Sequence, residues 1–391
     1  MTAALFTNTD HQHMAEAIRL AWRGLYTTHP NPRVGCVLVK DGQVVGQGWH
    51  QIAGEGHAEV NALSQAGANA QGATAYVSLE PCSHHGKTPP CAEALIQAGV
   101  AKVISAMEDP NPKVSGRGHQ LLEAAGIQTA CGLLQEQAER INPGFNKRMR
   151  TGLPWVVVKS AMSVDGRTAM ADGESQWITG PAARADVQRL RARSEAIVTG
   201  VETVIADDAS LTVRPEMWPQ AVAGDDSLCG WNWPAGFEPK QPLRVIVDSR
   251  LRTPVTAKIL SQTGKTLIVC TQAEPLRRQA LEATGAEVLQ LPAVEGRVDL
   301  NALLQELATR EVNEVLVEAG AVLAGAFAQQ QLMDQWVCYM APKLMGSSAR
   351  PVLDMDIDTM SQARELHLTD LRQIGQDIRM TYIPKTDSWR P

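Results

Sequence analysis

Three short stretches, His57-Ala58-Glu59, Pro81-Cys82 and Cys91, decide the fold and chemistry of the first half of the chain. One histidine and two cysteines give a zinc ion three protein ligands and leave a fourth tetrahedral position open for water. Zinc lowers the pKa of that water, and a nearby carboxylate can carry the proton that is released. The pattern therefore predicts a catalytic zinc centre with ligands His57, Cys82 and Cys91 and with Glu59 as the catalytic acid and base.

His-x-Glu followed by Pro-Cys matches the signature of zinc deaminases, which remove an amino group from a ring carbon. That signature has two residues between its cysteines, whereas Ser83 to Pro90 make eight residues here. His84 and His85 in this loop are alternative ligands, although the cysteines already complete an open site. Together with Lys87, they are expected to face substrate or solvent. The competing interpretation is a closed structural zinc site or unrelated buried cysteines.

The sequence around these ligands predicts a three-layer α/β sandwich. Lys40-Asp41-Gly42-Gln43 separates two apolar runs, which indicates a hairpin over 34–48. Residues i and i+2 do not share a helix face, so His57 and Glu59 are expected in the first turn of a helix over 57–66. The remaining predictions are helices over 13–25, 91–98 and 118–125, and strands over 73–79 and 100–106.

Two polar residues flank this hairpin. Asn31 precedes the first strand, where it either hydrogen-bonds a substrate or forms a plain turn. His50 is expected to be a locally satisfied histidine.

The bulk composition limits the class of protein. The 391 residues predict two domains, since a single core rarely exceeds roughly 250–300 residues. The net charge of −6 argues against a nucleic-acid partner. No apolar run reaches the ~20 residues of a membrane span, and the N-terminus lacks a signal-peptide layout, so a cytoplasmic location is expected. Seven cysteines, an odd number, argue against a disulfide framework.

The second half begins a new α/β series. Pro and Gly interrupt residues 142–154, which places the boundary near residue 150, with a deaminase domain over 1–150 and a second domain over 151–391. Strands alternate with helices and predict a mostly parallel sheet. The stretch 216–239, rich in Trp, Pro and Gly, predicts a surface insertion. The strands are expected over 155–159, 196–199, 243–248, 266–269, 287–291, 314–318 and 335–340, and helices over 180–194, 276–284 and 300–309.

The chain resembles the bifunctional riboflavin-biosynthesis deaminase/reductase family. The long inter-cysteine loop 80–91 carries the resemblance, as do 159–167 (KSAMSVDGR), 207–214 (DDASLTVR) and 317–320 (VEAG). The resemblance implies an N-terminal cytidine-deaminase-like domain and a C-terminal dihydrofolate-reductase-like domain. It also implies deamination of 2,5-diamino-6-ribosylamino-4-pyrimidinone 5′-phosphate, followed by NADPH-dependent reduction of the ribosyl group. Only the insertion at 216–239 has no match in the family pattern.

The resemblance also implies the contacts of the second domain. Substrate contacts fall on Ser175, Arg191, Leu211, Arg214 and Glu318. Cofactor contacts fall on Ala161, Trp177, Thr203, Asp207, Ser249, Gly320, Ala321, Val322, Leu323, Ala324, Gly325 and Ala326.

The residues of the second domain support these contacts only in part. No Gly-x-Gly-x-x-Gly is present. The small residues after Glu318 can admit a pyrophosphate to backbone N–H groups, or they can form a tightly packed turn. Arg191 and Arg214 suit a phosphate ester, whereas the other arginines of 180–194 are expected on a solvated face. Lys159, at a strand end, is hypothesised to contact the ribose hydroxyls or carbonyl.

Two other functions compete with this interpretation. A zinc deaminase acting on free nucleosides or tRNA bases is disfavoured by the acidic charge and by the whole second domain. A non-catalytic metal- or nucleotide-binding protein is disfavoured by Glu59, because a structural zinc needs no adjacent carboxylate. The sequence leaves open the choice between NADPH and NADH, the oligomeric state, with a homo-oligomer as one option, and transfer of the intermediate between domains.

Overall fold

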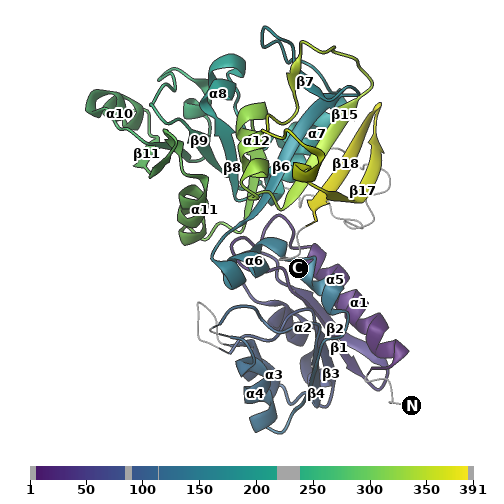
Figure 1. Cartoon of the computed structure of the whole chain (residues 1–391). Helices are drawn as coiled ribbons and strands as arrows, with labels where there is room; N and C mark the ends of the chain where they lie inside the picture. Colours follow the sequence, from purple (N-terminus) through teal and green to yellow (C-terminus); the bar gives the residue numbers. More distant parts are fainter. Residues whose placement is uncertain (1–5, 84–89, 113, 218–237, 386–391) are drawn as a thin grey trace. The chain divides into compact units, whose positions relative to one another are not determined.

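The computed structural model describes residues 6–83, 90–112, 114–217 and 238–385 (Figure 1). Contacts divide the chain into two compact units, one ending at Gly152 and the other beginning at Leu153. No helix in the described ranges is long and apolar enough to cross a membrane. The loop histidines His84 and His85, Lys87, and most of the insertion at 216–239 lie outside the described residues.

The first unit is built on one five-stranded sheet with the order β2-β1-β3-β4-β5. The first three strands in this order are antiparallel, and β3, β4 and β5 are parallel. Asp41 and Gly42 both have positive φ in the turn between the first two strands, which confirms the predicted Asp-Gly hairpin. The strands are β1 (Gly35–Lys40), β2 (Gln43–Trp49), β3 (Thr74–Val77), β4 (Lys102–Ser105) and β5 (Gln128–Cys131).

Helices cover both faces of this sheet, so the predicted three-layer sandwich is confirmed. Along β1, Val37 and Val39 pack into the core beneath α1 and α5, whereas Cys36 and Leu38 pack into the core beneath α2, α3 and α4. Each face of the sheet therefore has its own core. The helices are α1 (Asn8–Trp22), α2 (Ala58–Ala66), α3 (Cys91–Gln97), α4 (Arg117–Ala124), α5 (Gln135–Glu139) and α6 (Pro143–Thr151).

Helix α2 lies directly against β2. A Cβ atom on Gly46 would lie 2.3 Å from the carbonyl oxygen of Ala62, and one on Gly48 would lie 2.4 Å from that of Ala58. Only glycine fits at both positions, because contact this close leaves no room for a side chain. The helix that begins beside His57 is therefore seated on the sheet by its backbone.

Several elements of the first unit differ from the sequence prediction. Helix α1 begins at Asn8 instead of residue 13, because Thr7 and Asp10 form a capping box. Strand β5 was not predicted, since its four residues Gln-Thr-Ala-Cys lack an apolar pattern. Residues 142–147 were expected as a connecting segment, but Asn142 is the N-cap of α6 and 143–147 belong to the helix, in which Pro143 occupies the first turn, a position that tolerates proline.

The second unit is built on a nine-stranded sheet with the order β11-β10-β9-β8-β14-β6-β15-β18-β17. The seven strands from β11 to β15 are parallel to their neighbours, as predicted. Strands β18 and β17 add an antiparallel hairpin, whose tight Gly375-Gln376 turn was not recognised in the sequence. The strands are β6 (Trp155–Ser163), β8 (Ala196–Gly200), β9 (Leu243–Val247), β10 (Thr266–Cys270), β11 (Glu287–Gln290), β14 (Glu314–Glu318), β15 (Gln335–Ala341), β17 (Leu366–Ile374) and β18 (Asp377–Pro384). Short two-stranded ribbons pair β7 (Arg167–Ala169) with β16 (Arg350–Pro351), and β12 (Ala293–Val294) with β13 (Arg297–Val298).

Helices again cover both faces of this sheet. One core contains residues of α7 (Pro181–Arg193), α8 (Val201–Asp207), α9 (Lys258–Ser261) and α10 (Pro275–Glu282). The other contains residues of α11 (Leu300–Thr309) and α12 (Ala321–Gln329). Strand β14 comes late in the sequence but is inserted between β8 and β6. Ligands of open α/β sheets bind at such a change in strand order, beyond the carboxyl ends of the strands.

Candidate functional site

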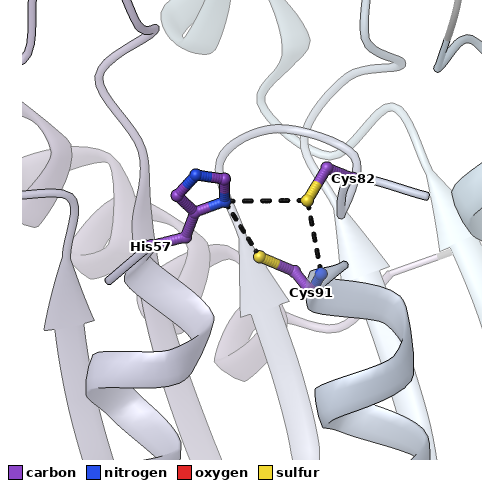
Figure 2. A group of neighbouring side chains, drawn as sticks. All are labelled: His57, Cys82 and Cys91. Carbon is purple, nitrogen blue, oxygen red and sulfur yellow. Dashed lines mark hydrogen bonds between the residues drawn. The ribbon is translucent and has the colours of Figure 1, made fainter. Parts of the chain in front are cut away.

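The three predicted zinc ligands come together in the first unit (Figure 2). His57 precedes α2 as its N-cap, Cys82 follows β3, and Cys91 is the first residue of α3. The Nδ1 atom of His57 lies 3.1 Å from Sγ of Cys91 and 3.6 Å from Sγ of Cys82. All three ligand atoms lie within 4.8 Å of one another. Three ligand atoms at this spacing suit one zinc ion and leave a coordination position open.

The thiols of this cluster are held in a state that suits a metal. The backbone N–H of Cys91, at the start of α3, donates to Sγ of Cys82 at 3.3 Å. The hydrogen bond from the Cys91 thiol, together with those from His57 and the Cys91 N–H, lowers the pKa of Cys82 well below its ordinary value. The same interaction raises the pKa of the Cys91 thiol. Of the two thiols, Cys82 therefore loses its proton more readily, and the thiolate is the form that binds metal.

Glu59 lies beside the cluster in the first turn of α2, as predicted. Its side chain is 3% exposed. Burial and the nearby Cys82 raise the pKa of Glu59 to about 7, although His57 acts in the opposite direction. A carboxyl group with a pKa close to the working pH can both accept and return a proton.

The pair Asn31 and His50 borders the metal cluster. Nδ1 of the buried His50 lies 3.2 Å from the carbonyl oxygen of Gly56, which can only accept a hydrogen bond. Burial lowers the pKa of His50, so its other nitrogen, Nε2, accepts from Nδ2 of Asn31 at 3.1 Å. His50 is thus the locally satisfied histidine that was expected. Its ring stands edge-on to that of His57, 5.2 Å away, and Asn31 is fixed close to the metal ligands.

In the second unit, a cluster of charged groups forms where the end of β14 meets the middle of β6. Lys159 does not end its strand as predicted, because β6 continues to Ser163. Lys159 and Glu318 are direct neighbours across these parallel strands. Arg191 from α7 donates to both carboxylate oxygens of Glu318, at 2.6 and 3.0 Å, and to the carbonyl oxygen of Thr212 at 2.9 Å. The guanidinium N–H groups of Arg191 that were expected to hold a phosphate are therefore already hydrogen-bonded to Glu318.

Lys159 lies beside this ion pair. Its ammonium group lies 6.0 Å from the centre of the Tyr339 ring and forms no hydrogen bond within the described ranges. Burial and the charge of Arg191 lower the pKa of Lys159, although Glu318 acts in the opposite direction. Lys159 is thus a basic side chain beside the carboxylate of Glu318, with no hydrogen-bond partner in the described ranges.

Other predicted contacts meet in the segment before α7. The hydroxyl of Ser175 donates to Asp207 of α8 at 3.3 Å. Trp177 is 62% exposed, and the guanidinium of Arg184 lies over its ring at 4.4 Å. Lys343 donates to the carbonyl oxygen of Trp177 at 2.5 Å. Trp177 therefore presents an exposed ring held from behind by Arg184, a residue that sequence reasoning had assigned to a solvated face.

Three more of the predicted contacts follow carboxyl ends of parallel strands. Thr203 follows β8, Ser249 follows β9, and Gly320 follows β14 as the N-cap of α12. Leu211 is buried, and burial together with the charge of Arg191 lowers the pKa of Arg214. Thr203, Ser249 and Gly320 thus share one edge of the sheet, where the fold type places its ligands.

The small-residue run after β14 is divided by burial. Gly320 to Leu323, at the start of α12, are partly or fully exposed, whereas Ala324 and Gly325 are buried. A Cβ atom on Gly325 would lie 2.0 Å from the carbonyl oxygen of Asp354. Gly325 is therefore explained by close packing of α12 against Asp354, a tertiary contact outside the strand–helix turn.

Comparison with known proteins gives the same division of the chain. Residues 7–107 match the family described as the cytidine and deoxycytidylate deaminase zinc-binding region, and residues 154–380 match the RibD C-terminal domain. The riboflavin biosynthesis protein RibD of Escherichia coli is 48% identical over 94% of this chain and 98% of its own length. The chain belongs to the RibD family.

Solved structures of RibD proteins agree with this assignment. One form of Acinetobacter baumannii RibD is 46% identical, covers 96% of this chain and 99% of its own, and superposes with a TM-score of 0.84. A Thermotoga maritima protein described as a diaminohydroxyphosphoribosylaminopyrimidine deaminase and 5-amino-6-(5-phosphoribosylamino)uracil reductase is 27% identical with a TM-score of 0.80. It covers 96% of this chain and 99% of its own. A cytidine-deaminase-like unit followed by a RibD reductase unit is therefore the fold of this chain.

Sequence reasoning missed three features of this RibD-family chain. It placed Arg184 on a solvated face, because the approach of Trp177 to α7 is a tertiary contact. It did not predict that Arg191 and Glu318 pair, since 127 residues separate them. It also overlooked Glu80, whose proximity to Pro81-Cys82 was the only available signal.

Proposed function

We propose that this chain carries out two successive steps of riboflavin biosynthesis. The first is hydrolytic deamination of 2,5-diamino-6-ribosylamino-4-pyrimidinone 5′-phosphate by residues 1–150. The second is NADPH-dependent reduction of the ribosyl group by residues 151–391, which gives 5-amino-6-ribitylamino-uracil 5′-phosphate. The observation that carries the proposal is the cluster of His57, Cys82 and Cys91 with the buried Glu59 beside it, in one chain with a RibD reductase unit.

In the deaminase step, His57 and the two thiolates hold the zinc ion, which supplies a water of lowered pKa when bound. Glu59 would accept the two protons that the hydrolytic water gives up in turn, and would deliver one to the ring nitrogen and the other to the departing ammonia. Its pKa of about 7 suits both directions of transfer. Asn31 is held beside the ligands by His50, which places an amide oxygen where it can accept a hydrogen bond from the substrate.

In the reductase step, the chain's residues bind and orient two ligands so that a hydride passes from NADPH to the ribose carbonyl. The proposed substrate contacts are Ser175, Leu211, Arg214, Glu318 and Arg191. Since the guanidinium N–H groups of Arg191 are already hydrogen-bonded to Glu318, Arg214 is the stronger candidate for the phosphate. Lys159 is proposed to contact the ribose hydroxyls or carbonyl, because its side chain lies beside Glu318 and has no hydrogen-bond partner in the described ranges.

The proposed cofactor contacts surround the same strand ends. They are Ala161, Trp177, Thr203, Asp207, Ser249 and the segment from Gly320 to Ala326. Within that segment, the exposed start of α12 is the part that can meet a pyrophosphate directly, since its backbone N–H groups lack partners in the preceding turn. Trp177 offers an exposed ring for stacking. A homo-oligomer and a cytoplasmic location stay predictions.

The test is incubation of the protein with the diaminopyrimidine phosphate, with and without NADPH, and detection of both products by mass. We expect replacement of one amino group by oxygen without NADPH, and a further gain of two hydrogens with NADPH. Ammonia release from cytidine serves as the comparison for a general zinc deaminase. Equal turnover of cytidine would contradict the substrate, and absence of the two-hydrogen gain would remove the reductase half.

A further inference from the structure

Glu80 is a buried carboxylate that the proposed chemistry does not use. It lies two residues before the zinc ligand Cys82 and is 3% exposed. Its oxygens accept four backbone N–H groups that come from a different segment of the chain. Oε2 accepts from Asp109 at 3.1 Å and Gly116 at 3.0 Å, and Oε1 accepts from Gly118 at 2.9 Å and His119 at 3.3 Å.

These donors include the start of helix α4, which has no cap of its own. The N-cap residue of α4 is Gly116, whose φ of 73° lies in the left-handed region and which has no side chain to bind the free N–H groups. Glu80 takes over this role from another part of the unit, and its negative charge suits the positive end of the helix. The carboxylate therefore joins the Cys82 segment to α4.

Backbone packing also joins the Cys82 segment to α4. A Cβ atom on Gly118 would lie 2.0 Å from the carbonyl oxygen of Pro81, so α4 rests directly on the residue between Glu80 and Cys82. From the other side, α3 holds Cys82 itself. Ala92 donates to its carbonyl oxygen at 3.2 Å, and Cys91 donates to its sulfur at 3.3 Å. Cys82 is thus held between the starts of two helices.

We propose that Glu80 is a positioning residue for the zinc site. Because Glu80 accepts hydrogen bonds from four backbone N–H groups, it fixes the backbone at Pro81. The backbone at Pro81 in turn sets the position of the Cys82 sulfur relative to His57 and Cys91. This inference rests on the proposed zinc centre. Residues that orient metal ligands typically change metal affinity by about 10- to 100-fold when they are replaced.

The experiment replaces Glu80 by Gln in the full-length protein. Glu80→Gln puts an NH₂ group against two of the four N–H donors, so the segment must shift. We expect zinc affinity to fall by about 10- to 100-fold, measured by competition with a chromophoric chelator at a temperature where the variant is folded. Deaminase turnover should fall as zinc is lost, and reductase turnover should be unchanged.

Glu139→Gln is the matched control. Glu139 is also a buried carboxylate of the first unit, at 6% exposure, and it accepts from Arg150 at 2.8 Å. It belongs to α5, outside the segments that carry the zinc ligands. The control should lose thermal stability but keep the zinc affinity of the wild type.

Gly118→Ala is the second variant, and it decides the question if Glu80→Gln does not fold. It leaves the carboxylate in place but pushes a Cβ atom against Pro81, and we expect the same fall in zinc affinity. Wild-type affinity in the folded variants would overturn the inference. Failure of the wild-type protein to bind zinc would instead overturn the proposed metal centre.

Discussion

The metal centre of the first unit and the strand ends of the second unit bring their residues together in different ways. In the first unit, His57, Cys82 and Cys91 already contact one another, and the groups around them are buried. In the second unit, the proposed contacts are distributed over the ends of several parallel strands, and their main mutual contact is the ion pair of Arg191 with Glu318. A metal site depends on a few direct distances, whereas a site for two large ligands depends on the edge of a whole sheet.

The prediction with the largest expected effect asks whether the first site can lose deaminase activity and still bind zinc. Glu59→Gln removes the proton carrier without adding or removing a large group. We expect deaminase turnover to fall by about 10²- to 10⁴-fold, the usual contribution of general acid–base catalysis. Ammonia release measures turnover, and zinc content and reductase turnover serve as controls that should not change. Full deaminase turnover with zinc retained would show that another group carries the proton.

The second prediction tests whether structure and chemistry can be separated in the same way in the second site. Glu318→Gln leaves Arg191 charged, buried and without its partner, which costs about 3–5 kcal/mol of unfolding free energy. Urea denaturation should show this loss in the second unit together with a fall in reductase turnover. A folded variant with wild-type stability would contradict the importance of the pair.

The same ion pair predicts a pH dependence. Burial alone would raise the pKa of Glu318, but Arg191, by charge and hydrogen bond, lowers it below the ordinary value of 4.5. A carboxyl whose pKa is lower in the folded state stabilises the protein above 4.5, and this contribution is lost as the pH falls through the folded-state value. Wild-type stability should therefore fall below pH 4.5, and Glu318→Gln should flatten that part of the curve.

A smaller effect is expected where the second site borders its core. Gly325→Ala places a methyl group against the carbonyl oxygen of Asp354, which should cost about 1–3 kcal/mol of stability, as overpacking does. NADPH affinity at a temperature where the variant is folded should change little, because the exposed start of α12 is the part of the segment from Gly320 to Ala326 that is proposed to meet the cofactor, and Gly325 is buried. A large loss of NADPH affinity in a stable variant would show that Gly325 contacts the cofactor.

The smallest predicted effect concerns the exposed ring in the second site. Arg184→Met keeps an aliphatic stem but removes the guanidinium behind Trp177. An exposed cation–π contact contributes about 0.5–1 kcal/mol, so the dissociation constant for NADPH should rise by about 2- to 5-fold. Fluorescence titration measures this change, and Trp177→Phe combined with Arg184→Met should show non-additive losses. Additive losses would mean that Arg184 does not act through the ring.

The difference between the sites also explains what the sequence could predict. His57, Glu59, Cys82 and Cys91 lie in short motifs whose spacing follows from metal chemistry, and the structure brings them together. The parallel strands were predicted from their apolar runs, and their carboxyl ends imply a common edge. The contact of Arg184 with Trp177 and the burial of Gly325 against Asp354 depend on how distant segments pack, so local pattern could not reveal them. The capping of α4 by Glu80 is a tertiary contact of the same kind.

The two glycines of β2, Gly46 and Gly48, determine which substitutions this enzyme tolerates near its metal site. With Gly46 and Gly48 under α2, the depth of the helix that starts beside His57 and carries Glu59 is set by backbone atoms on both sides. Substitutions among the aliphatic side chains packed beneath α2 would then change the free energy of unfolding more than they change the position of the Glu59 carboxyl group relative to His57. Substitutions among the leucines and valines around the centre should therefore be limited only by their effect on stability, whereas any side chain at Gly46 or Gly48 would also displace α2.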